Sequence, residues 1–224
     1  MSAEPAAPGL AERLRPGLRA GAALGVVAFL VGLSFGVLAR PEMGVVAPIV
    51  MSALVFAGAA QFGALAVLVA GGGAVPAVVA GVLLNARFLP MGLALGPSLP
   101  GRALRRALEG QAVVDASWAL ANRGDGTFDR YMLLGATLPQ YPLWIIGTAV
   151  GTLAGDSIGD PEALGLDALF PAFFLALLVP ELKDRRTVGV ALASAAVALA
   201  LTPVAPAGLP VLAACLPALW GLRR

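Results

Sequence analysis

A stretch in the second apolar run of the chain combines small residues with polar ones, and polar residues at membrane depth are costly. Residues 52–62 include Ser52, Phe56, Gly58 and Gln61. A buried amide needs hydrogen-bond partners, and Gly58 between two alanines leaves a thin, flexible backbone. We expect a broken helix here, with these four residues as candidates for binding a polar solute, as in discontinuous transporter helices. The alternative is a packing face in which Gln61 bonds to a neighbouring helix.

Asn85 and Arg87 lie about halfway along the third apolar run. A cation at the bilayer centre costs roughly 2.5–3.5 kcal/mol on insertion scales. Arg87 could clamp a substrate carboxylate through two hydrogen bonds, so both residues are candidate substrate-binding residues. The alternatives are snorkelling of the side chain and a structural ion pair, for which the available acids are Asp115, Asp167 and Glu181.

Two further polar positions have competing interpretations. Asp115 is a candidate proton carrier and also a candidate partner of Arg87, although an interfacial aspartate can simply face water. Gln140 precedes Tyr141 and Trp144, a sequence typical of an interface turn with aromatic anchors.

The composition excludes most other chemistry. Of 224 residues, 59% are hydrophobic and 12% are charged, and the mean hydropathy is +0.88, whereas a soluble domain carries about 25% charged residues. His is absent and Cys215 is the single cysteine, so imidazole metal sites and His-based triads have no ligands or bases. A net charge of +2 gives no footprint for nucleic acid. We expect a membrane protein that is not an enzyme, with no cofactor and no metal.

The elements that must position these residues are long apolar runs, since a membrane helix needs about 20 apolar residues. Residues 100–130 are rich in charge, and their apolar stretch is too short to span, so we expect an interfacial amphipathic helix followed by a turn at 122–126. The prediction is an all-α polytopic membrane protein with about seven transmembrane helices. The expected spans are residues 17–39, 45–70, 74–99, 131–155, 164–182, 187–202 and 208–222.

Loop charges predict orientation, because basic loops stay in the cytoplasm. The five arginines of residues 100–130 place that linker inside, and the acidic residues of 156–162 fit the outside. Three spans before the linker would put the N-terminus outside, despite Arg13, Arg15 and Arg19. Either these arginines are tolerated outside, or residues 45–70 are re-entrant and do not cross.

Two glycine-spaced segments indicate an internal duplication. Gly32-x-x-x-Gly36 and Gly147-x-x-x-Gly151 are each followed by a short loop and an interrupted apolar helix. A three-helix unit repeated across the linker would have inverted topology, while chance similarity between Gly/Ala-rich helices is the alternative. The predicted division is a mobile tail (1–16), a first membrane repeat (17–99), a cytoplasmic amphipathic linker (100–130), a second membrane repeat (131–203) and a final membrane helix (204–224).

The stretch Ser52-Ala53-Leu54-Val55-Phe56-Ala57-Gly58-Ala59-Ala60-Gln61-Phe62 resembles the signature of the AzlC family, the large subunits of bacterial branched-chain amino-acid exporters. Weaker matches lie in the expected order along the chain, at residues 32–36 before this stretch and at residues 84–88 and 115–119 after it. The resemblance covers roughly residues 17–220. The sequence departs from the family at Phe88, where a histidine is common, and at Ala116, where a glutamate is frequent.

The resemblance implies export of branched-chain or related apolar amino acids. It also implies energisation by the proton gradient and a small membrane partner of the AzlD type. A non-transporting scaffold or assembly subunit, whose Gly-x-x-x-Gly helices serve only for packing, is the alternative.

Overall fold

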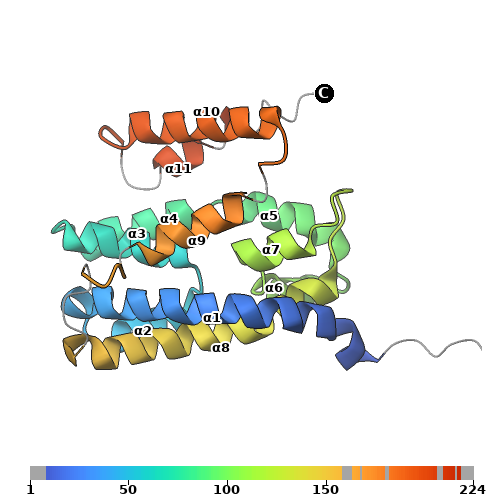
Figure 1. Cartoon of the computed structure of the whole chain (residues 1–224), viewed down its shortest axis with the longest axis horizontal. Coiled ribbons are helices and arrows are strands. Elements are labelled where there is room, and N and C mark those ends of the chain that lie inside the picture. The colour runs from blue at the N-terminus through green and yellow to red at the C-terminus, as the bar shows by residue number, and fades with distance from the viewer. Residues whose placement is uncertain are drawn as a thin grey trace, which may run out of the picture.

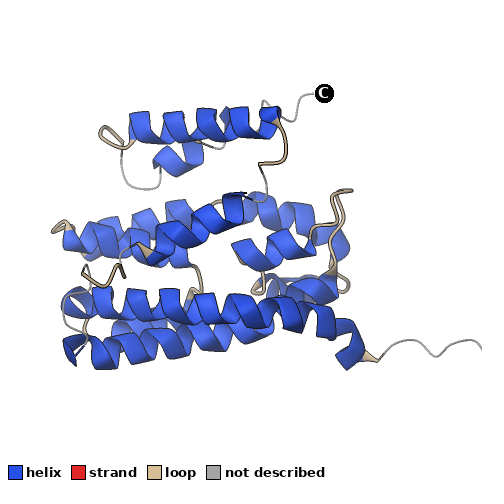
Figure 2. Ribbon diagram, in the orientation of Figure 1, coloured by secondary structure: helices blue, strands red, loops and turns tan. Residues whose placement is uncertain are grey.

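The structure, a computed structural model, describes residues 9–157, 163–166, 168–179, 182–205, 209–214 and 216–217. These residues form helices and loops without a strand (Figure 2), which confirms the all-α prediction. Asp167, Glu181, Cys215 and part of the predicted N-terminal tail lie outside the described residues. Figure 1 shows a lower layer with α1 and α8, a middle layer with α3, α4 and α9, and an outer layer with α10 and α11.

The longest helices form the base of the fold. α1 (Leu10–Met43) has 34 residues and is therefore about 50 Å long at 1.5 Å per residue. α8 (Arg130–Ala154) lies along it in the same direction: Gly17 packs against Gly135, and further along both helices Gly36 packs against Gly151. Glycines on both helices let the two backbones touch.

This parallel packing corrects the predicted repeat. In an inverted repeat across the linker, the segments around Gly32 and Gly147 would run antiparallel. They instead run parallel, and Gly32 meets the backbone of Trp144. The glycine spacing has a packing role, which accounts for its occurrence in both helices.

The second apolar run is broken where the sequence predicted. α2 (Val46–Leu54) ends, Val55–Ala57 form a non-helical connection, and α3 (Gly58–Val69) begins. Gln61 and Ser52 lie nine positions apart, yet Nε2 of Gln61 is 2.8 Å from Oγ of Ser52. A straight helix would separate residues at this spacing by roughly 13 Å, so the chain reverses at the break.

The direction of α3 shows that this run is re-entrant. The rings of Phe35 and Phe62 are 5.4 Å apart, and further along both helices Ala39 and Leu65 share one buried cluster. α3 therefore runs beside α1 in the same direction and returns towards the end from which α2 came. Residues 45–70 therefore enter and leave at the same end of the molecule and do not form one straight helix along its length.

α4 (Ala74–Asn85) and α5 (Phe88–Leu95) carry the chain back along the molecule. The break between them falls at residues 86–87, next to the polar residue Asn85. After the short 3-10 turn η1 (Gly96–Ser98), Leu99 joins Leu95 in a buried cluster with Leu133, near the start of α8. The chain thus returns to the end of the molecule at which α1 begins.

These directions resolve the conflict over the N-terminus. The start of α1 and the linker lie at one end, where the guanidinium of Arg13 stacks 4.0 Å from the ring centroid of Tyr131. The basic N-terminal residues and the basic linker therefore lie at the same end of the molecule, which is the arrangement that loop charges favour.

The linker has an exposed part and a part that turns inward. α6 (Ala103–Gly110) has no buried residue. Glu109 on α6 accepts two hydrogen bonds from Arg130, each 2.6 Å long. α7 (Asp115–Ala121) buries Ala116 and Ser117 inside the fold. The predicted turn at 122–126 closes through a bridge between Asn122 and Phe128.

The C-terminal helices are α9 (Leu169–Leu178), α10 (Arg185–Leu201) and α11 (Leu209–Ala213), with the 3-10 turn η2 (Gly155–Ser157) between α8 and α9. α10 packs on α11, and α11 contacts α4. Within the described ranges, two helical segments pass a test of length and composition for crossing a membrane, Leu10–Met43 and Ala74–Ser98.

Candidate functional site

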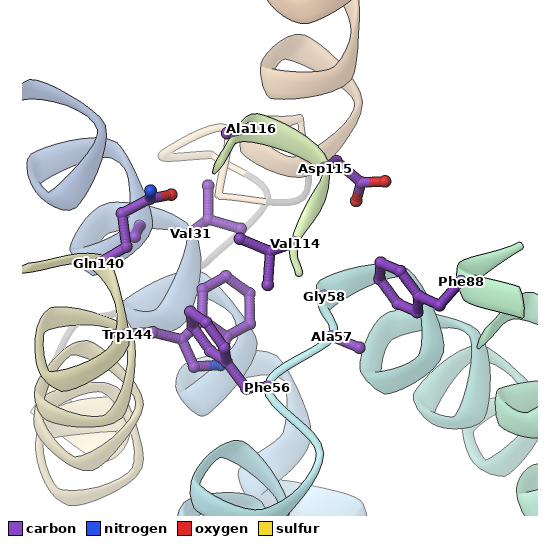
Figure 3. A pocket seen from close by; sticks show the side chains of 11 residues that line it. Val31, Phe56, Ala57, Gly58, Phe88, Val114, Asp115, Ala116, Gln140 and Trp144 are labelled. Carbon is purple, nitrogen blue, oxygen red and sulfur yellow. The ribbon is translucent and has the colours of Figure 1, made fainter. Parts of the chain in front are cut away.

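A cavity of about 50 Å³ lies at the point where the broken elements meet. The α2–α3 connection, the start of α5 and the start of α7 converge there between α1 and α8 (Figure 3). Its walls are mostly apolar, with the carboxylate of Asp115 and the amide of Gln140 as polar side chains. The remaining lining residues are Ala28, Val31, Phe56, Ala57, Gly58, Phe88, Val114, Ala116 and Trp144.

The N-terminus of α3 opens on this cavity. Ala57 is the N-cap, Gly58 is the first helical residue, and no side chain caps the helix. The first N–H groups of a helix have no partner within it, and the helix dipole adds partial positive charge there. Ala57 and Gly58 therefore present polar, positively polarised backbone to an otherwise apolar space.

A closed ring of hydrogen bonds fixes the re-entrant segment to α8. Nε1 of Trp144 donates to Oε1 of Gln61 (3.1 Å), and Nε2 of Gln61 is paired with Oγ of Ser52 (2.8 Å). Ser52 pairs with Oγ1 of Thr148 (2.8 Å), which donates to the carbonyl of Trp144 (3.0 Å). Ser52, Gln61 and Thr148 are fully buried. Ser52 and Gln61 thus hold the wall of the cavity and do not line it.

Arg87 forms an ion pair with Asp115, one of the three acids that the sequence offered as its partner. Its Nη2 lies 2.7 Å from Oδ2 of Asp115, and the two side chains are 17% and 26% exposed. Asp115 lines the cavity and Arg87 does not. The pair joins the α4–α5 break to the start of α7, so Arg87 contacts the cavity through Asp115.

Asn85 lies elsewhere. It lines a second, largely apolar groove of about 580 Å³ between α2, α3 and α4. Its Oδ1 is buried and lacks a hydrogen-bond partner among the described residues. Of the predicted site residues, the structure therefore brings Phe56, Gly58 and Asp115 together at one cavity, with Arg87 directly behind.

The expectation for Gln140 and Trp144 was wrong. They are 4% and 7% exposed, inside the fold and on the cavity wall, not at an interface. Gln140 donates to the carbonyl of Ala136 (2.7 Å). Tyr141, between them, is 40% exposed, so the run mixes an outer and an inner face of α8. Gln140 and Trp144 are four positions apart and share the inner face of α8, whereas Tyr141 lies on the outer face.

Comparison with known proteins agrees with this geometry. The family profile described as AzlC protein matches residues 23–158. The chain belongs to the AzlC family. The match runs from α1 through the end of α8, and every residue of the central cavity falls within it.

The chain's relatives are membrane proteins. An uncharacterized membrane protein of Archaeoglobus fulgidus is 31% identical over 71% of this chain and 72% of its own. One of Helicobacter pylori is 26% identical over 69% of both chains. The inner membrane protein YgaZ of Escherichia coli is 25% identical over 63% of this chain and 62% of its own. No solved structure matches the chain significantly.

Proposed function

We propose that this protein is the large subunit of a secondary transporter that exports branched-chain or related apolar amino acids across the bacterial cytoplasmic membrane. Membership of the AzlC family, which is associated with membrane transport, supports the general role. The observation that carries the proposal is the start of α3, without a side-chain cap, at a mostly apolar cavity. Half-helix N-termini near the middle of the fold bind anionic substrate groups in other transporters.

The cavity offers one partner for each part of an apolar amino acid. The N–H groups at Gly58 suit the carboxylate, and the carboxylate of Asp115 suits the ammonium group. Phe56, Val31 and Trp144 supply apolar surface for a branched side chain. This division of contacts assigns no charge clamp to Arg87, whose role is to hold Asp115.

The cavity is small in this structure. Its volume of about 50 Å³ is well below the roughly 300–1,000 Å³ of typical small-molecule pockets. A leucine needs the walls to move apart, as alternating access requires.

Asp115 is our candidate for proton coupling. Protonation of its carboxylate would remove the negative charge that faces Arg87 and the substrate ammonium group. An inward flow of protons through this group would then be tied to outward movement of the amino acid. A small AzlD-type subunit completes the proposed transporter, with the basic linker and the N-terminus in the cytoplasm.

Counterflow of radiolabelled leucine and valine into proteoliposomes, with and without the small subunit, tests the proposal. We expect uptake of label by the wild type. We expect Asp115→Asn to lose accumulation driven by a pH gradient, because its side chain cannot carry the charge. Counterflow should persist but need a higher amino-acid concentration, because a neutral amide binds the ammonium group less tightly than a carboxylate does. Asp125→Asn, in the exposed linker turn, is the matched control and should behave as the wild type.

Each alternative outcome has a definite meaning. No movement of either amino acid in both preparations would refute the substrate assignment. Full transport by a third preparation that contains the small subunit alone would favour the scaffold role. Unchanged gradient-driven accumulation in Asp115→Asn would refute its role in coupling.

A further inference from the structure

Phe56 lies between the central cavity and another, larger cavity, which is distinct from the groove at Asn85. The second cavity, of about 510 Å³, lies at the linker end between the starts of α1 and α8 and the end of α2. It opens outward, since Leu54 and Leu138 on its wall are 76% and 56% exposed. Phe56 is the residue that lines both cavities. We call this second cavity the vestibule.

The backbone of Phe56 adopts a conformation that side chains rarely take. Its φ is +42°, and it is the non-glycine residue with positive φ in the described part of the chain. For a bulky residue this conformation is strained. The contacts around the residue must therefore hold it in this conformation.

The contacts that hold Phe56 come from α8. Its ring meets the ring of Tyr141 edge-on at 4.9 Å and that of Trp144 at 6.5 Å. The hydroxyl of Tyr141 donates to the carbonyl of Ala53 (2.7 Å), near the end of α2. Figure 3 shows the rings of Phe56 and Trp144 side by side at the cavity. A shift of α2 along α8 would therefore loosen both the hydroxyl bond and the ring.

We propose that Phe56 is a gating residue whose ring closes the passage between the vestibule and the central cavity. The identity of what passes rests on the proposed function, but the gate does not. When the ring turns away, the two cavities become continuous and open at the linker end. The opposite wall has a matched aromatic residue, Phe88, which lines the central cavity and not the vestibule.

Thiol accessibility tests the gate without any substrate. Val31, 2% exposed on the cavity wall, is replaced by cysteine in a Cys215→Ser background. The purified protein is treated with a charged methanethiosulfonate reagent, and the modification rate is measured by mass spectrometry. We expect Phe56→Ala to raise the rate at least tenfold and Phe88→Ala to leave it within twofold of the parent.

Folding of each variant is checked by circular dichroism and by elution from a sizing column. If Phe56→Ala does not fold, Phe56→Leu, which keeps apolar bulk without an aromatic edge, serves in its place with a smaller expected increase of about threefold. An unchanged rate in the folded Phe56 variant overturns the gate, as does an equal increase in Phe88→Ala. Since labelling needs no transport, a negative result here is distinct from a failure to move leucine or valine.

Discussion

Glycines on α1 and α8 let the two helix backbones touch, and we call this line of contact the glycine seam. Adding a side chain to one of these glycines tests the packing of the two helices. A Cβ placed on Gly36 would lie 2.3 Å from the carbonyl oxygen of Thr148, and one on Gly147 would lie 2.2 Å from that of Phe29. Real Cβ atoms essentially never approach closer than 3.0 Å. Because the obstructing atoms are backbone, no rotamer change relieves the clash. Gly36→Ala must therefore push the helices apart by about 0.7 Å or more.

The net cost follows from two opposing effects. Alanine favours the helix over glycine by about 1 kcal/mol, while overpacking a close contact costs about 1–3 kcal/mol. Here the clash is with backbone, and separation also loosens neighbouring contacts along the seam, so the cost lies at or above the upper end of that range. We expect a net loss of about 2 kcal/mol, or a fall in Tm of roughly 4–8 °C for a chain of this size.

Thermal unfolding in detergent, followed by circular dichroism, measures this effect. The controls are Gly92→Ala on α5 and Gly189→Ala on α10, whose added Cβ atoms meet nothing within 4 Å. These should keep the wild-type Tm or raise it. A Gly36→Ala variant that melts with the wild type would show that the helices do not touch as described.

Three further perturbations are predicted. Arg87→Ala leaves the partly buried Asp115 without this ion pair and should cost about 1–3 kcal/mol, with recovery of Tm in the double variant with Asp115→Asn. Gln61→Leu removes the partner of the Trp144 indole N–H and should cost about 1–3 kcal/mol; an unchanged Tm would contradict the closed ring. Hydrogen bonds from Arg130 hold the pKa of Glu109 below its ordinary value of 4.5, so this pair stabilises the fold above that pH and the stability is lost as pH falls through the lowered pKa. Melting curves between pH 3 and pH 7 should show that acid loss in the wild type and a weaker one in Glu109→Gln.

The sequence was informative about where helices break. Gly58 and Gln61 within an apolar run predicted the interruption after α2, because polar groups at membrane depth are costly and need a local reason. The break after α4 was not predicted, since residues 74–99 were expected to form one span, although the polar residues Asn85 and Arg87 lie at that point.

The direction of each segment after a break was not predictable in the same way. Hydropathy is the same for a helix that crosses and for one that turns back, so residues 45–70 satisfied both interpretations. The reversal depends on Gln61 meeting Trp144, which is distant in sequence. Trp144 itself was misplaced because its neighbours Tyr141 and Pro142 suit an interface, while its own partner could not be read from the chain.

The parallel pairing of α1 with α8 has a consequence for biosynthesis. α1 is complete roughly 100 residues before α8 exists, and at about 5–20 residues per second this leaves a delay of about 5–20 s. Throughout that time the glycine face of α1 lacks its partner, and such faces also associate with other helices of the same kind. Two newly made chains on one polysome would expose the same face at the same time. Slowing translation between the two helices should accordingly lower the yield of assembled protein more than slowing it after α8.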